Sequence, residues 1–224
     1  MFEQSFTERI IHRVDLETRR IRAPYHRKKL NNTDFSIISN NCWGGVLYEY
    51  YGLPKLSPTV GSYWFAQDYL RFLSRFDYYI NKEIHIISAQ ESSHKEELIT
   101  RGENNIPIGI LDDGVEIVFL HYKDPEVARE KWNRRIERIN YNNLIFKFSE
   151  MNQCSEELLK KFDSMDLPGK RFFFVRKMDD VDKYKNALYY PGYDEDIEIL
   201  NDTYYFNKYI NVPELINNGL LIAR

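Results

Sequence analysis

Hydrophobic positions along the chain follow two spacings, one typical of strands and one typical of helices. Short, nearly uninterrupted apolar runs bounded by polar or turn residues predict strands. These runs lie at residues 35–39, 84–87, 107–111, 115–120, 144–148 and 171–175. The sequence Asp112-Asp113-Gly114 separates two of the runs and predicts a tight hairpin.

Apolar residues that recur every three or four positions predict helices. The best-marked helix begins at Asp124-Pro125, because Asp suits the N-cap and Pro suits the first helical position. Its apolar stripe is formed by Ala128, Trp132, Ile136 and Ile139. Other helices are predicted over residues 7–21, 42–51, 63–76 and 155–162, with shorter pieces at 204–210 and 213–218.

This alternation predicts an α/β fold. We expect a single three-layer domain with a largely parallel mixed sheet, helices on both faces and one antiparallel hairpin. Within it we expect an N-terminal helical arm at 1–30, a core at 34–176 and a C-terminal helical extension at 177–224. Ligands of such sheets bind outside the carboxyl ends of the strands, so those ends are where a site is sought.

Composition narrows the function classes. With 43% hydrophobic and 29% charged residues, the 224-residue chain is typical of a globular domain rather than a disordered one. A net charge of −3 argues against a dedicated nucleic-acid binder. We expect no secretory signal, because the N-terminal stretch has no apolar h-region. We also expect no membrane span, because no apolar run approaches about 18 residues.

The two cysteines are too few for a disulfide framework. We therefore expect Cys42 and Cys154 to be free thiols in a cytoplasmic protein. Basic residues between 19 and 29 leave open a peripheral contact with a membrane surface, against the alternative of a solvated helix.

Cys42 is the residue that most clearly indicates chemistry. It lies where the first predicted strand passes into a helix, so we expect it in the first helical turn. A helix N-terminus favours the thiolate, which is the nucleophile, and so predicts a lowered thiol pKa. Asn40 and Asn41 can cap the helix or offer amide N–H groups to an oxyanion. The alternative is a buried structural cysteine.

Residues around Cys42 suggest a substrate site. Gly44 and Gly45 are poor helix formers, and next to a nucleophile they would leave room for a substrate. Trp43, Tyr63 and Trp64 are candidate sugar-stacking groups, and their alternative role is in the hydrophobic core.

A cysteine nucleophile needs a base, and His121 is the best of the five histidines. It ends an apolar strand, and in a parallel sheet it would emerge at the same edge as Cys42. The alternative is a strand-end histidine bonded to the backbone. Glu150 is the preferred third, orienting group, with Asn152 and Asp112 left open.

Arg135 and Arg138 lie on the predicted helix after Pro125 and are candidates for holding an anionic group such as a phosphate. The alternative is a solvated face paired with nearby glutamates. We expect no metal site, since Asp112-Asp113-Gly114 is better explained as a turn. The sequence has no Gly-rich phosphate loop, which argues against a nucleoside-triphosphate or dinucleotide enzyme.

The stretch 35–45, which contains Asn-Asn-Cys-Trp-Gly-Gly, resembles the opening signature of an uncharacterised bacterial family usually described as exopolysaccharide biosynthesis proteins. The resemblance covers about residues 34–176. It implies a bacterial α/β protein that works with capsule or surface-polysaccharide assembly, without supplying a reaction. The family's second signature is matched by His121, Glu126, Ala128, Trp132, Arg135, Arg138, Ile139 and Asn140.

We therefore expect a Cys–His acyltransferase acting on a carbohydrate. It would require no cofactor, and its acyl donor would be a molecule such as acetyl-CoA. An esterase with the same residues is the first alternative. The second is a non-catalytic or glycosyltransferase-like protein that binds a sugar phosphate, with Cys42 structural. The sequence leaves the oligomeric state open.

Overall fold

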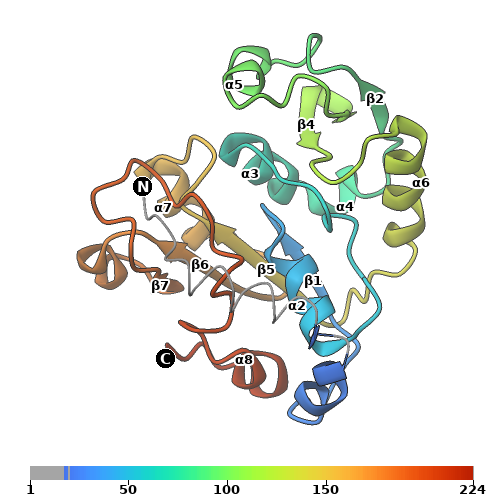
Figure 1. Ribbon diagram of the computed structural model, residues 1–224. Helices are drawn as coiled ribbons and strands as arrows, with labels where there is room; N and C mark the ends of the chain where they lie inside the picture. Colours follow the sequence, from blue (N-terminus) through green and yellow to red (C-terminus); the bar gives the residue numbers. More distant parts are fainter. Residues whose placement is uncertain (1–17, 20, 224) are drawn as a thin grey trace.

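The computed structural model describes residues 18, 19 and 21–223 of the chain (Figure 1). At its centre is a four-stranded sheet in the order β1-β5-β6-β7, in which all neighbouring strands are parallel. Its strands are β1 (Ser36–Ser39), β5 (Leu144–Ser149), β6 (Lys170–Val175) and β7 (Ala187–Tyr189). The predicted helix over 7–21 lies almost entirely outside the described residues.

A second, smaller sheet is antiparallel and has the order β2-β3-β4. Its strands are β2 (His85–Ile87), β3 (Ile108–Leu111) and β4 (Val115–Val118). Figure 1 shows it beside the parallel sheet, with α5 (Lys95–Thr100) next to it. The predicted α/β class is confirmed, and the predicted hairpin is β3–β4, which lies in this separate sheet.

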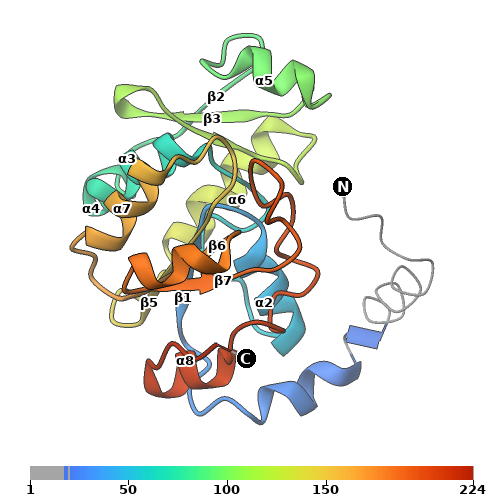
Figure 2. The ribbon, with the colours of Figure 1, turned by 90° about the vertical axis from the view of Figure 1, so that its left-hand side faces the viewer.

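Helices cover both faces of the parallel sheet, and together they make three layers (Figure 2). Helices α3, α4, α6 and α7 pack on one face, while α2 and α8 pack on the other. The bounds of these helices are α2 (Trp43–Tyr51), α3 (Ala66–Ser74), α4 (Phe76–Tyr79), α6 (Pro125–Ile136), α7 (Glu156–Ser164) and α8 (Val212–Asn218).

Alternation along the strands produces the two cores. Successive side chains of a strand point to opposite faces. Ile38 and Phe146 therefore join the cluster under α3 and α7, while Ile37 and Ile145 join the cluster under α2 and α8. Both faces are buried, which explains why the strands read as continuous apolar runs rather than as alternating ones.

Several predicted elements differ from the observed ones. Residues 204–208 form turns rather than a helix, and Ile210 forms an isolated antiparallel bridge with Ala223. The helix predicted over 63–76 begins only at Ala66, because Tyr63 is extended and bridges to Val118 of the small sheet. The segment after residue 177 is not purely helical, since β7 adds a strand to the parallel sheet.

The N-cap of α6 offers a direct stability test. The Asp124 side chain accepts hydrogen bonds from the backbone N–H groups of Glu126 and Val127, at 2.8 and 3.2 Å. We expect Asp124→Ala to lower the free energy of unfolding by about 0.5–2 kcal/mol in urea denaturation. Asp124→Asn keeps a capping acceptor and should stay close to wild type, so equal losses in both variants would contradict the capping role.

Candidate functional site

Cys42 and His121 meet at the surface of the protein. Cys42 follows β1 and occupies the N-cap position of α2, one residue before the expected first turn. Its Sγ lies 3.3 Å from Nε2 of His121 and also donates to the carbonyl oxygen of Ser62 at 3.8 Å. Cys42 is partly buried, whereas His121 is exposed. The structure thus places a thiol and an imidazole in direct contact, with solvent access from the imidazole side.

The two residues come from different sheets. We expected them at one edge of a parallel sheet, but β4, which precedes His121, belongs to the antiparallel sheet. The junction is made by the chain segment 60–63. Tyr63 pairs with Val118 of β4, and the backbone N–H of His121 donates to the carbonyl oxygen of Gly61 at 3.1 Å.

The environment of the thiol favours its neutral form. Burial, followed by the negative charge of Asp202, raises the pKa of Cys42 to about 12, and Lys147 only partly opposes this effect. The expected lowering of this pKa by the helix N-terminus is therefore wrong. Near neutral pH the sulfur carries its proton, so attack by Cys42 requires a base to remove that proton.

A buried polar cluster lies behind Cys42, and the sequence analysis missed it. Lys147 of β5 and Asp202 form a fully buried ion pair, and Ser149 also donates to Asp202. Asn41 joins the cluster through Nδ2, which donates to Asp202 at 2.8 Å, and Oδ1, which accepts from Lys147 at 3.0 Å. The available signal was a lysine inside the apolar run 144–148, since lysine is almost never fully buried without a partner.

The two asparagines are structural rather than oxyanion donors. Asn41 is committed to the polar cluster and also accepts the backbone N–H of Trp43, the first residue of α2, at 3.1 Å. Asn40 is fully buried, and its Nδ2 donates to the carbonyl oxygen of Ser149 at 3.3 Å. Both amides therefore hold the loop that carries Cys42 instead of facing a substrate.

The glycines after Cys42 serve packing, not substrate access. A Cβ on Gly44 would lie 3.0 Å from Ile37, and a Cβ on Gly45 would lie 3.1 Å from Val60. These contacts bring α2 close to β1 and to the segment that carries Ser62. The space that the two glycines leave is thus filled by Ile37 and Val60 inside the protein.

The three aromatic residues proposed for sugar stacking are core residues. Trp43 is fully buried, packs edge-on against Phe172 and donates its indole N–H to the carbonyl oxygen of Phe206. Trp64 is also fully buried, and Tyr63 is 5% exposed. None of them presents a ring face to a ligand.

None of the three candidate orienting groups is hydrogen-bonded to His121 in the described part of the chain. Glu150 accepts from the backbone N–H and the Nε of Arg176, both at 2.9 Å. Asp112 is bound by Tyr78 and Lys82 instead. Asn152 pairs with the carbonyl oxygen of Trp64 and with Arg101. His121 is therefore held through its backbone rather than by a carboxylate.

The two arginines expected to bind an anion have different environments. Arg135 is buried, and its Nη1 donates to the carbonyl oxygen of Val60 at 2.7 Å and to the hydroxyl of Tyr122 at 2.5 Å. It thus belongs to the support of the site. Arg138 is exposed. The structure does not bring the two together on one ligand.

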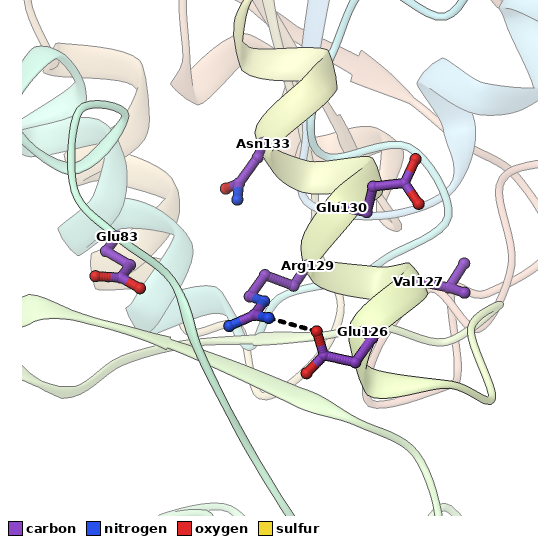
Figure 3. A pocket seen from close by; sticks show the side chains of 6 residues that line it. All are labelled: Glu83, Glu126, Val127, Arg129, Glu130 and Asn133. Carbon is purple, nitrogen blue, oxygen red and sulfur yellow. Dashed lines mark hydrogen bonds and ion pairs between the residues drawn. The ribbon is translucent and has the colours of Figure 1, made fainter.

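A surface depression of about 480 Å³ runs along α6 (Figure 3). Figure 3 shows Glu83 facing the helix across this depression and Arg129 paired with Glu126. The lining is mainly acidic and includes neither Cys42 nor His121. It consists of Glu83, Glu126, Val127, Arg129, Glu130 and Asn133.

Two kinds of feature are absent from the part of the chain that the structure describes. Across residues 18, 19 and 21–223, no three or more His, Cys, Asp or Glu side chains are grouped in a way that would hold a metal ion. No helix in the same ranges is long and apolar enough to cross a membrane.

Comparison with known proteins places the chain in a family. The model of a domain of unknown function, DUF1919, matches residues 14–218. The chain belongs to this family. This DUF1919 protein is also similar to an uncharacterized protein of Haemophilus influenzae. The two are 27% identical over 173 residues, which cover 77% of this chain and 76% of the relative.

The raised thiol pKa of this DUF1919 protein predicts unusual alkylation behaviour. We expect the rate at which iodoacetamide modifies Cys42 to keep rising beyond about pH 10, because burial and Asp202 hold its pKa at about 12. An ordinary thiol levels off above its pKa of about 8.5. Rates would be measured by mass mapping of the Cys42 peptide, with the denatured protein as control. A plateau below about pH 9 would contradict the prediction.

The buried ion pair predicts that its loss destabilises the protein far more than the loss of a more exposed Lys–Asp pair. Asp202→Ala leaves the fully buried ammonium of Lys147 without its carboxylate, which should lower the free energy of unfolding by about 3–5 kcal/mol. The matched control is Asp180→Ala, which breaks the more exposed pair with Lys183 and should cost far less, because exposed ion pairs contribute little to stability. Similar losses in urea denaturation of the two variants would refute the special role of the buried pair.

Proposed function

We propose that this protein is a Cys–His acyltransferase of bacterial surface-polysaccharide biosynthesis that acts on a glycan or a sugar precursor. The observation that carries the proposal is the 3.3 Å contact between Cys42 Sγ and His121 Nε2. This distance is within reach for proton transfer between a nucleophile and its base.

The proposed reaction has two steps. Cys42 Sγ bonds to the acyl carbon while its proton passes to His121 Nε2, and the donor's leaving group departs with that proton, which leaves a thioester on Cys42. A sugar hydroxyl then gives its proton to His121 and attacks the thioester. The ester forms, the C–S bond breaks, and the proton returns to the sulfur.

The raised pKa of Cys42 fits general-base activation rather than a preformed thiolate. Because the thiol is protonated at rest, His121 must take the proton as the sulfur attacks. Backbone N–H groups in the first turn of α2 are the remaining donors for an oxyanion. Asn41 already accepts from Trp43 N–H, which leaves Gly44 and Gly45 N–H for this role.

The substrate class comes from the resemblance in the sequence, not from the geometry. The carbohydrate acceptor follows from the similarity of stretch 35–45 to the exopolysaccharide biosynthesis family. An acyl donor such as acetyl-CoA supplies the group to be transferred, and no other cofactor is needed for the two steps. We also propose a cytoplasmic location, where free thiols such as Cys42 and Cys154 persist.

An esterase is the second candidate, and one observation favours it. His121 is exposed, so water reaches the imidazole that would activate the second nucleophile. Hydrolysis uses the same first step and differs only in which hydroxyl attacks the thioester. The sugar-phosphate-binding alternative has less support for two reasons. Arg135 Nη1 already donates to Val60 and Tyr122, and the Cys42 sulfur contacts His121 rather than the core.

The test uses an activated ester, p-nitrophenyl acetate. We expect a burst of p-nitrophenol and the addition of one acetyl group to Cys42, seen by mass mapping. Cys42→Ala should abolish both, while Cys154→Ala should leave them unchanged. His121→Ala should slow acylation at about pH 7 by roughly 10²–10⁴-fold. The deficit should shrink near pH 10, because part of the thiol then ionises without a base.

The second step separates the two candidates. Acetyl-Cys42 enzyme mixed with sugars should pass its acetyl group to a sugar hydroxyl if the protein is a transferase. Release of acetate alone, at a rate that sugars do not change, would favour the esterase. Absence of any acetyl group on Cys42 of the folded wild-type protein would overturn the proposed function.

A further inference from the structure

The 3.3 Å contact between Cys42 and His121 depends on how two separate parts of the fold meet. Cys42 belongs to the loop after β1, and His121 follows β4 of the antiparallel sheet. No carboxylate is hydrogen-bonded to His121 among the residues that the structure describes. The hydrogen bonds that link the two parts at the pair run through the backbone between them.

That backbone is the segment 60–62, which contacts both members of the pair. The carbonyl oxygen of Ser62 accepts from Cys42 Sγ at 3.8 Å. The carbonyl oxygen of the preceding Gly61 accepts from the backbone N–H of His121 at 3.1 Å. A displacement of this segment would therefore move the thiol and the imidazole relative to each other.

Arg135 and Tyr122 hold the segment in place from behind. The carbonyl oxygen of Val60 accepts from Arg135 Nη1 at 2.7 Å and from the Tyr122 hydroxyl at 2.9 Å. The same Nη1 also donates to the Tyr122 hydroxyl at 2.5 Å, so the three groups are hydrogen-bonded to one another. Tyr122 follows His121 directly, so fixing its ring also fixes the residue before it.

The charge of Arg135 makes this arrangement unusual. Arg135 is 8% exposed, and within the described ranges no carboxylate oxygen lies within 4 Å of it. Burial of a guanidinium is costly unless its hydrogen bonds are satisfied. Here the partners it finds are the backbone carbonyl of Val60, in the segment 60–62, and the hydroxyl of Tyr122, the residue after His121.

Gly61 completes the arrangement. Its φ of +84° lies in the left-handed region, and a Cβ there would come within 2.9 Å of the Tyr122 ring and hydroxyl. Only glycine combines this backbone conformation with so close an approach to the ring. The segment is therefore shaped around Tyr122 as well as bonded to it.

We propose that Arg135 and Tyr122 are positioning residues that fix the Cys42–His121 pair by locking the segment 60–62, to which both members are hydrogen-bonded. Their role resembles that of the orienting carboxylate in a catalytic triad, but they act on the backbone that holds the pair instead of on the imidazole. The inference rests on the proposed Cys–His chemistry. Misplacement of a reacting group by about 1 Å costs on the order of 10²-fold in rate.

The experiment measures acylation of Cys42 by p-nitrophenyl acetate in Tyr122→Phe, Arg135→Met and Arg135→Lys. At about pH 7 we expect roughly 10- to 100-fold slower acylation in the first two variants, with an unchanged KM. Arg135→Lys should recover part of the rate, because an ammonium can still donate to Val60. Arg134→Met is the matched control, since Arg134 pairs with Glu130 on the same helix, and it should behave as wild type.

The pH dependence separates positioning from a general structural role. A positioning defect weakens only the step that needs His121, so the deficit of Tyr122→Phe should shrink near pH 10, as it should for His121→Ala. A deficit that is equal at both pH values, or a wild-type rate in both Tyr122→Phe and Arg135→Met, would overturn the inference. Thermal unfolding checks that each variant is folded, and Tyr122→Phe is the mildest change.

A second readout distinguishes this inference from the proposed function. The pH profile of Cys42 alkylation by iodoacetamide needs no acyl chemistry. If the wild type forms no thioester, the proposed function fails, and a shift of the alkylation profile by Tyr122→Phe toward that of His121→Ala would still support positioning. If alkylation in Tyr122→Phe and Arg135→Met equals wild type while His121→Ala differs, positioning fails and the proposed function stands.

Discussion

The buried ion pair between Lys147 and Asp202 is the constraint on which the site depends. An ammonium or a carboxylate without a partner is very costly at a fully buried position, so neither residue can leave the other. The ion pair connects Asp202, in the segment after β7, to Lys147 of β5 in the parallel sheet. Through Asn41 it also holds the loop that ends in Cys42. The position of the thiol is thus set by charges that never touch solvent.

The same cluster also sets the chemistry of the sulfur. Burial of Cys42 and, after it, the negative charge of Asp202 disfavour a thiolate more than Lys147 favours it. A helix N-terminus contributes only about 0.3–1 kcal/mol to a nearby anion, so burial decides the outcome. In the proposed reaction the thiol therefore needs His121 as its base. The contact between the two residues depends on how the small antiparallel sheet packs against the parallel one.

Local sequence signals predicted the features that depend on neighbouring residues. Asp124 caps its helix as expected, and the apolar runs mark six of the seven strands in the part of the chain that the structure describes. The roles of Trp43 and Trp64 were misread, because an aromatic residue in a core and one in a site have the same local pattern. Lys147 meets Asp202 across 55 residues and Arg135 meets Val60 across 75, and no local pattern indicates either contact.

The separation of Cys42 and His121 along the chain has a consequence for synthesis. The cysteine is made first, and His121, its proposed base, follows 79 residues later. The segment 60–62 lies between them in sequence, while Arg135, Lys147 and Asp202 come after both. A nascent chain therefore exposes a thiol that is still without its partner and its supports. A translation product that ends before His121 lacks the Cys42–His121 contact.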